Sequence, residues 1–161
     1  MNRTRLLTTM AVLIAIGTIG SQMLWFPTGV AKAYPVQHAV NVIAAVLLGP
    51  GPAVAIAFII GLLRNMLGLG TILAFPGGMI GAFLAGYFYK KFGKKIWASA
   101  GEVIGTGIFG SLLSVPIANV ILGSSVGALF YVPSFLISSF TGATIALFVV
   151  ARVKSNDLVR I

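Results

Sequence analysis

Six long apolar runs, separated by short stretches rich in polar residues, glycine or proline, make up almost the whole chain. A helix that crosses the hydrocarbon core of a bilayer uses roughly 20 apolar residues, so these runs predict transmembrane helices. The second run is short for a bilayer. The Gly49-Pro50-Gly51-Pro52 segment after it predicts a tight reversal, because proline ends one helix and suits the first turn of the next. The predicted helices span residues 6–25, 36–48, 52–68, 76–90, 95–122 and 128–151.

Composition supports lipid as the solvent for this chain. Of its 161 residues, 58% are hydrophobic and only 8% are charged, which leaves too little polar surface for a soluble domain. The absence of cysteine excludes disulfides, thiolate metal sites and cysteine nucleophiles. We therefore expect an all-α integral membrane protein, a compact bundle of six transmembrane helices in one domain over residues 1–161.

The net charge of +9 raises the possibility of nucleic-acid binding, but the basic residues are in the wrong pattern for it. They lie at the two ends and in the cluster Lys90, Lys91, Lys94 and Lys95, with no basic stripe among exposed aromatics. Positive residues flank transmembrane helices on the cytoplasmic side. A cytoplasmic amino terminus puts all but two basic residues in the cytoplasm, so both termini are predicted there.

The amino terminus has some features of a secretory signal. Arg3 and Arg5 precede the first apolar run, and Ala31-Lys32-Ala33 has the spacing of a cleavage site. The run from Leu6 to Phe26 is longer than the usual apolar region of about 7 to 15 residues in such signals. We expect it to remain as the first transmembrane helix.

Small residues recur at every fourth position in the later helices, as in Gly77-Gly81-Ala85 and Gly101-Gly105. In lipid this spacing lets helix backbones approach closely. We therefore expect these positions to pack helices together rather than to bind a ligand.

Polar and aromatic side chains gather toward the predicted outer end of the bundle. Because polar groups inside a bilayer are costly unless they pair or line a cavity, their positions indicate function. The sequence predicts substrate-binding positions at Trp25, Tyr34, Gln37, His38, Asn41, Arg64, Asn65, Asn119 and Tyr131.

The second helix carries three of these residues close together. His38 and Asn41 are three positions apart and share a helix face, and Gln37 shares a neighbouring face with Asn41. They are expected either to contact a ligand, or to cap the start of the helix and bond to neighbouring helices. A single histidine without cysteines or nearby carboxylates does not form a metal site.

Arg64 is a charged residue on an otherwise apolar helix. Gly61 and Gly68 lie on its own face and leave room for a partner. Two interpretations remain open: Arg64 anchors a ligand or a loop, or it snorkels to the outer surface.

Pro116 lies within the fifth predicted helix and frees the carbonyl of Leu112, while Asn119 places an amide one turn further on. A bend next to an amide suits a pocket wall. The alternative is a packing bend that Ser111 or Ser114 satisfies.

Acidic residues are scarce, which limits the chemistry available. Glu102 is expected to pair with Lys94 and Lys95 at the cytoplasmic interface rather than to couple transport to protons. With Glu102 and Asp157 both assigned to the cytoplasmic half, the single histidine has no predicted acid–base partner at the outer end. The chain also lacks a GxxxxGK phosphate loop. We predict that it is not an enzyme, carries no cofactor and cannot hydrolyse ATP by itself.

Several of these segments together resemble the ThiW family of the energy-coupling factor importers. The resemblance covers residues 6–90 by motif and the remainder by length and helix number. The segments that carry it are Pro35-Val36-Gln37-His38 with Asn41, Leu47-Leu48-Gly49-Pro50, Arg64-Asn65, and Leu73-Ala74-Phe75-Pro76-Gly77-Gly78-Met79-Ile80-Gly81-Ala82.

The resemblance implies a six-helix substrate-binding subunit in the plasma membrane of a prokaryote. Such a subunit would capture hydroxyethylthiazole, a thiamine precursor, and pass it to a transmembrane coupling protein with two ATPase subunits. Related subunits use an alanine-xxx-alanine motif on the first helix against the coupling protein, a spacing that Ala11 and Ala15 share. Alternatives are a subunit for thiamine or another vitamin, a proton-coupled secondary transporter using Glu102, and a structural subunit of a larger assembly.

Overall fold

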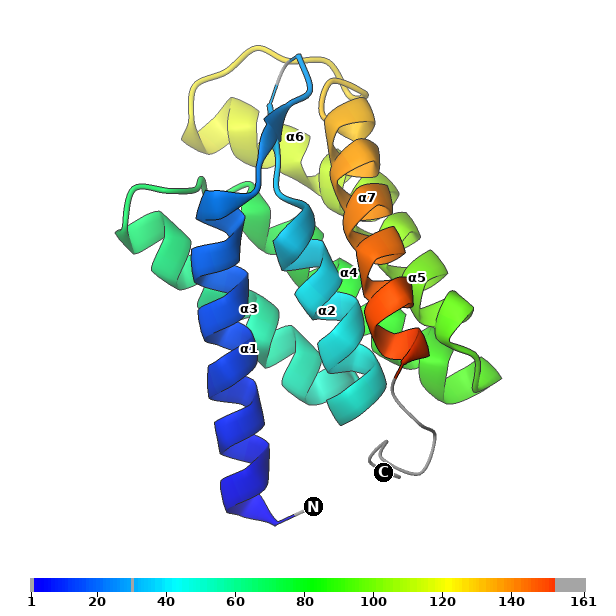
Figure 1. Cartoon of the computed structure of the whole chain (residues 1–161). Coiled ribbons are helices and arrows are strands. Elements are labelled where there is room, and N and C mark those ends of the chain that lie inside the picture. Colours follow the sequence, from blue (N-terminus) through cyan, green and yellow to red (C-terminus); the bar gives the residue numbers. More distant parts are fainter. Residues whose placement is uncertain (1, 30, 153–161) are drawn as a thin grey trace.

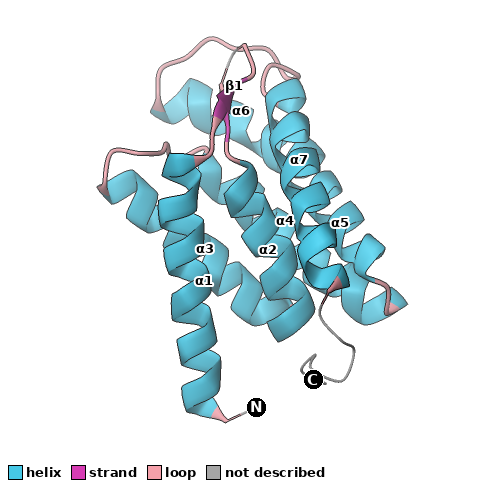
Figure 2. Ribbon diagram, viewed as in Figure 1, coloured by secondary structure: helices cyan, strands magenta, loops and turns pink. Residues whose placement is uncertain are grey.

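The computed structural model describes residues 2–29 and 31–152 (Figures 1 and 2). Within these ranges the chain is helical apart from loops and one short hairpin. The elements are α1 (Arg3–Met23), β1 (Phe26–Pro27), β2 (Lys32–Ala33), α2 (Pro35–Leu48), α3 (Pro50–Met66), α4 (Ala74–Phe92), α5 (Lys95–Ile104), the π-helix η1 (Gly105–Gly110), α6 (Ser111–Ile121) and α7 (Val132–Ala151).

These elements form the predicted all-α bundle. Three stretches of the described chain are long and apolar enough to cross a membrane by length and composition, namely α1, the continuous span Lys95–Ile121, and α7. The shorter apolar helices α2 and α3 and the 19-residue α4 complete the bundle. The six predicted helices are therefore confirmed, with shifted ends.

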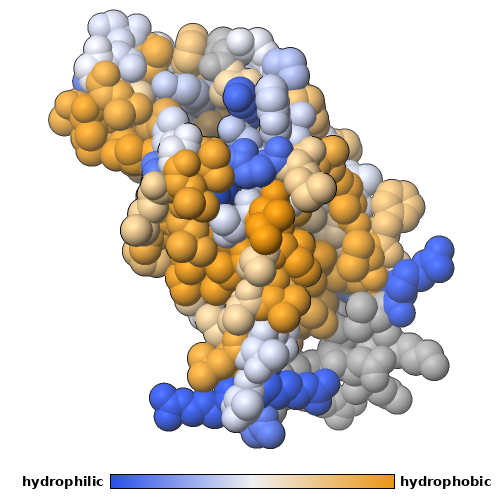
Figure 3. Space-filling view, turned by 60° about the vertical axis from the view of Figure 1, so that its left-hand side comes forward, coloured by the Kyte–Doolittle hydropathy of each residue, from blue (hydrophilic) through white to orange (hydrophobic). Residues whose placement is uncertain are grey.

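The bundle has two chemically different ends. At the lower end of Figure 1, α1 begins, α7 ends, and α4 turns into α5 through the residue 90–95 lysine cluster. We call this the lysine end. The opposite end carries the hairpin within residues 24–34 and the loops 67–73 and 122–131, and we call it the loop end. Figure 3 shows apolar surface between hydrophilic atoms at the lower end and those in a hollow of the upper half.

The central helix is α2, which is buried on almost every side and packs against α1, α3, α4, α5 and α7. Its last turn ends at Gly49, whose φ of 83° suits glycine, and α3 begins at the next residue with Pro50. The predicted tight hairpin between the second and third helices is thus confirmed.

Glycines bring α4 against the span Lys95–Ile121. Gly110 lies against the backbone of Gly77, and Gly105 lies against the backbone of Gly81, so a side chain at either position would collide with the facing helix. Gly101 packs in the same way on Leu84. The packing role expected for the small residues is confirmed, and it fixes the depth at which the polar residues of these helices face each other.

Two features of the fold were not predicted from the sequence. One is the two-residue β1–β2 pair, in which Phe26 faces Ala33 in antiparallel register. The other is the π-helix Gly105–Gly110, which interrupts the fifth predicted helix between α5 and α6 and ends well before Pro116. The last helix also begins later than predicted, at Val132, because residues 122–131 form a loop.

Candidate ligand-binding site

A cavity of about 590 Å³ lies at the loop end. Its walls come from α1, α2, α3, α4, η1 and α7, and the residues that border it from above belong to the hairpin and to the loops 67–73 and 122–131. Pockets of roughly 300–1,000 Å³ with apolar walls and a few polar groups are typical of small-molecule sites. The cavity therefore has the size and position of a ligand-binding site.

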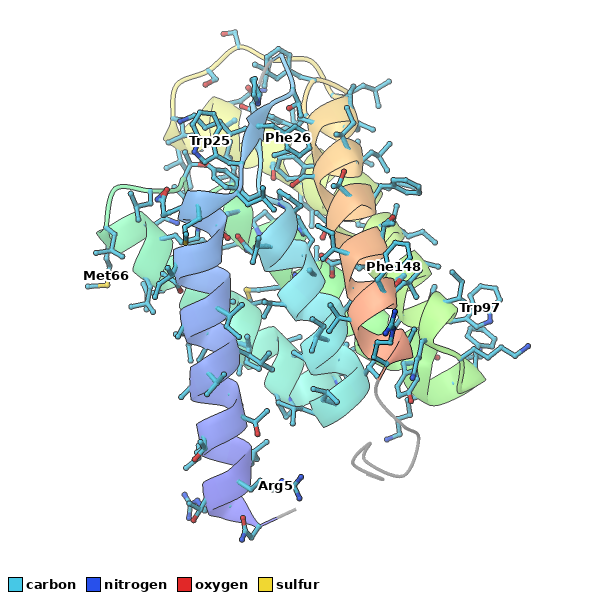
Figure 4. The ribbon with its side chains drawn as sticks, in the orientation of Figure 1. Arg5, Trp25, Phe26, Met66, Trp97 and Phe148 are labelled. Carbon is cyan, nitrogen blue, oxygen red and sulfur yellow. The ribbon has the colours of Figure 1, made fainter. Side chains whose placement is uncertain are left out.

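Two thirds of the predicted substrate-binding residues line this cavity, although they come from four different parts of the chain. Trp25 and Tyr34 flank the hairpin, and Figure 4 shows Trp25 at the loop end, far from Arg5 at the lysine end. The predicted residues that line the cavity are Trp25, Tyr34, Gln37, His38, Arg64 and Tyr131.

Asn41 is placed differently, below the cavity and out of contact with it. Its side chain is fully buried, and its Nδ2 donates to the Gly78 carbonyl at 3.2 Å and to Glu102 Oε1 at 3.1 Å. Asn41 therefore acts on the site through Glu102 rather than by lining the cavity.

Asn65 and Asn119 hold loops instead of lining the cavity. Asn65 Nδ2 donates to the carbonyls of Gly61 at 2.8 Å and Thr71 at 3.1 Å, which ties the loop 67–73 to α3. Asn119 bonds in both directions with the backbone of Val126, at 3.1 and 3.2 Å, and so fixes the loop 122–131. The pocket-wall interpretation of Asn119 is not what the structure shows. Its amide shapes a loop that borders the cavity.

The position predicted for Glu102 is wrong. The sequence placed it at the cytoplasmic interface beside Lys94 and Lys95, but its side chain is fully buried and its Oε1 lies 2.8 Å from His38 Nδ1. The same oxygen lies 3.0 Å from Thr106 Oγ1. The close packing of α5 on α4 at Gly101 carries Glu102 into the bundle, so the histidine has a carboxylate partner that the sequence did not predict.

Arg64 is buried and does not snorkel. Only 1% of it is exposed, its Nη1 donates to Gln37 Oε1, and its Nη2 donates to the Leu69 carbonyl at 3.2 Å. Its guanidinium carbon lies 3.9 Å from the centre of the Tyr34 ring. Arg64 thus joins three segments around the cavity, which agrees with loop anchoring among the alternatives that the sequence left open.

Aromatic rings provide much of the apolar wall. The Lys32 ammonium lies 4.1 Å from the Trp25 ring centre, at the rim of the cavity. The Tyr131 and Phe135 rings lie 5.9 Å apart, and both line the cavity. Such rings suit a flat heteroaromatic ligand, because they offer a large contact area with little conformational freedom to lose.

Several residues that line the cavity were not predicted from the sequence. Ser134 and Ser138 lie one turn apart on α7, and Ser138 Oγ accepts a hydrogen bond from the Tyr34 backbone N–H at 2.8 Å. Their spacing in an apolar helix is a signal that could have marked this face. Thr106 and Gln22 also line the cavity. Thr106 lies in η1, where α-helical periodicity no longer holds.

Ala11 and Ala15, unlike the residues that line the cavity, lie on the outer surface of the bundle. Both are exposed on α1, in a row with the exposed Leu7 and Ile19 at four-residue spacing. Most of the apolar length of α1 is uncovered by the rest of the described chain. This face is therefore open to lipid or to another membrane helix.

The described residues contain no group of three side chains of the types that usually hold a metal ion. What they do contain is a helical membrane bundle with a cavity at one end, lined by aromatic rings and by polar groups that bond to one another. This combination defines a membrane protein that binds a small molecule at one side of the bilayer.

Comparison with known families agrees with this class and narrows it. Residues 7–156 match the ThiW family, described as thiamine-precursor transporter protein, and the chain belongs to this family. Curated proteins and solved structures gave no match. The chain is thus a membrane-embedded transporter component whose ligand class is a thiamine precursor.

Proposed function

We propose that this chain is the substrate-binding subunit of an energy-coupling factor importer and that it captures hydroxyethylthiazole from outside the cell. The observation that carries the proposal is the cavity at the loop end, in a chain of the thiamine-precursor transporter family. A small heteroaromatic alcohol needs flat apolar contacts and a few placed hydrogen-bonding groups. Trp25, Tyr131 and Phe135 offer the first, and His38 and Ser134 offer the second.

The proposed orientation puts the loop end outside. The lysine cluster and the basic start of α1 share the other end, and positively charged flanks favour the cytoplasm. The cavity then faces the external medium, from which the precursor would be captured.

Partner subunits would supply the energy for transport. The chain has no phosphate-binding loop, so ATP hydrolysis would belong to two ATPase subunits acting through a transmembrane coupling protein. The exposed row that contains Ala11 and Ala15 supports α1 as the docking surface. Two small side chains one turn apart leave a flat strip on which another helix can lie closely.

Ligand binding by the purified chain in detergent, without ATP, tests the proposal. We expect hydroxyethylthiazole to raise the melting temperature in a concentration-dependent way, because a ligand that binds only the native state stabilises it. No shift with hydroxyethylthiazole would refute the substrate assignment.

A matched pair of tryptophans gives the control. Trp25 and Trp97 are 43% and 41% exposed, but Trp25 lines the cavity whereas Trp97 lies at the lysine end (Figure 4). Trp25→Ala is expected to reduce the ligand-induced shift and Trp97→Ala to leave it unchanged. Equal effects of the two substitutions would contradict binding in this cavity.

One observation favours a second candidate, a proton-coupled secondary transporter. Glu102 is buried beside a cavity-lining histidine, which is where a proton-carrying carboxylate would act. That function predicts uptake by the chain alone in liposomes with an imposed pH gradient, and loss of uptake in Glu102→Gln. The importer subunit predicts uptake only when the coupling protein, the ATPases and ATP are present.

A further inference from the structure

The two ring nitrogens of His38 have different surroundings. Nδ1 lies 2.8 Å from Glu102 Oε1, whereas no hydrogen bond within the described residues occupies Nε2. His38 lines the cavity and its side chain is 11% exposed, while Glu102 behind it is completely enclosed. The ring therefore stands between a sealed carboxylate and the ligand space, with one nitrogen left for a ligand.

The carboxylate is held in place by other donors as well. Glu102 Oε1 accepts a hydrogen bond from Asn41 Nδ2 at 3.1 Å and lies 3.0 Å from Thr106 Oγ1. Thr106 Oγ1 also lies 2.9 Å from the Gly77 carbonyl, so its single proton serves one of the two oxygens. This network, drawn from α2, α5 and η1, fixes the side of the imidazole ring that faces the cavity.

Charge balance decides what Nε2 offers. Among the described residues, His38 is the only cationic group within ion-pair distance of the Glu102 carboxylate, and Glu102 Oε2 is buried without a hydrogen-bond partner. An ionised carboxylate is costly in such a place, so a neutral histidine–carboxylate pair is favoured over a net negative one. The neutral pair exists either as imidazolium with carboxylate or as imidazole with a carboxylic acid that donates to Nδ1. In both forms Nε2 of the ring carries a proton. His38 then presents a hydrogen-bond donor to the cavity.

Arg64 does not contact Glu102 and so does not replace the imidazole as its direct partner. The hydrogen bonds of its guanidinium go to Gln37 and to the Leu69 carbonyl, and its guanidinium carbon lies over the Tyr34 ring. Glu102 is the one acidic residue among those that the structure describes. With Arg64 buried beside the cavity and Lys32 at its rim, the surroundings of the ligand are rich in positive charge and donors.

We infer that His38 Nε2 donates a hydrogen bond to an unalkylated ring nitrogen of a neutral heteroaromatic ligand, with Glu102 as the positioning residue behind it. This inference rests on the proposed function and adds a rule of selectivity to it. A thiazole has a lone pair on its ring nitrogen and accepts the bond. A thiazolium, as in thiamine, has a substituent in place of the lone pair and brings a positive charge next to Arg64 and Lys32. The site therefore selects the precursor over the finished vitamin.

Three ligands of nearly the same shape test this rule by calorimetry with the whole chain in detergent. They are hydroxyethylthiazole, its thiophene analogue in which CH replaces the ring nitrogen, and its N-methyl thiazolium salt. We expect the thiazole to bind at least about tenfold more tightly than either analogue, the factor that corresponds to one net hydrogen bond. Equal affinities for thiazole and thiophene, or tight binding of the thiazolium, would overturn the inference and leave the proposed function intact. Failure of all three to bind would overturn both.

Two variants separate positioning from folding. In Glu102→Gln, the amide oxygen accepts from Asn41 and from His38 Nδ1–H, which leaves Nε2 as an acceptor. In Glu102→Gln we therefore expect thiazole and thiophene to bind with about equal affinity, and we expect the same in His38→Phe. The thiophene should still bind to both variants. The exposed Val149→Leu serves as the control and keeps the wild-type preference. A variant that keeps the tenfold preference without Glu102 contradicts the positioning role. If Glu102→Gln does not fold, the three-ligand series on the wild-type chain still decides.

Discussion

The guanidinium of Arg64 lies over the ring of Tyr34, 3.9 Å from its centre, and so joins the end of α3 to the residue that precedes α2. The same guanidinium holds the Leu69 carbonyl of the adjacent loop. A single buried cation thereby connects three segments that border the cavity. Loss of this side chain should therefore destabilise the loop end more than the rest of the bundle.

The first prediction concerns this connection. Arg64→Lys keeps the charge but loses the planar fork, so one ammonium cannot hold Gln37, Leu69 and the Tyr34 ring together. We expect the loss of about 1–3 kcal/mol of stability and faster amide hydrogen exchange in residues 67–73. Arg5→Lys at the exposed start of α1 is the control and should change neither quantity. Unchanged exchange in the loop would show that Arg64 does not anchor it.

A second prediction concerns the close packing of α4 beneath the site. A methyl group at Gly81 would overlap Thr106 Oγ1 and lie 2.6 Å from Glu102 Oε2. Gly81→Ala should therefore destabilise the protein by about 1–3 kcal/mol and weaken ligand binding, because the carboxylate must move. Gly127→Ala, where the added methyl group meets no atom within 4 Å, should leave the melting temperature almost unchanged. Equal melting temperatures for the two variants would count against this packing.

The third prediction separates binding from coupling. Ala15→Leu adds bulk to an exposed face of α1 that is remote from the cavity lining, so ligand affinity and melting temperature should stay at wild-type values. Uptake by the assembled importer should fall by about tenfold or more, since close helix contact is lost. Val149→Leu, on the exposed face of α7, should retain full uptake. Full uptake by Ala15→Leu would refute α1 as the docking surface.

The fourth prediction fixes the orientation. Because the chain has no cysteine, single cysteines report position without background. Ser125→Cys in the exposed loop 122–131 should react with a membrane-impermeant maleimide added to intact cells. Lys91→Cys at the lysine end should react only after the membrane is opened. The reverse pattern would invert the bundle and place the cavity in the cytoplasm.

Hydrophobic runs and helix breakers were sufficient to predict the fold, because membrane helices are defined by length and composition alone. The Gly49-Pro50 turn and the small-residue contacts of α4 followed from the same local rules. The β1–β2 pair could not be found in this way, since two residues per strand carry no periodicity.

The candidate site was only partly predictable. Residues such as Tyr34 and Arg64 could be singled out because polar groups in an apolar chain are conspicuous. Their partners could not, because the bond between His38 and Glu102 joins residues 64 positions apart in sequence. Glu102 is buried because α5 packs closely on α4 at Gly101. No local sequence pattern predicts how closely two helices pack.

The π-helix Gly105–Gly110 has a consequence for the span that contains it. A π turn holds more residues than an α turn, so each such turn shifts the faces of the helix beyond it, by about 100° for one extra residue. In a regular α-helix with about 3.6 residues per turn, Leu113 and Val120 would lie on the same inward face as Glu102. In the structure these two side chains are 50% and 83% exposed. The inward positions are Ser111, Ser114 and Ala118 instead. The extra residue rotates bulky side chains out to the lipid and turns small ones toward the bundle. Deleting one residue from this segment would therefore restore a regular helix and still keep Ser111, Ser114 and Ala118 on its inward face, because the π turn accommodates one extra residue.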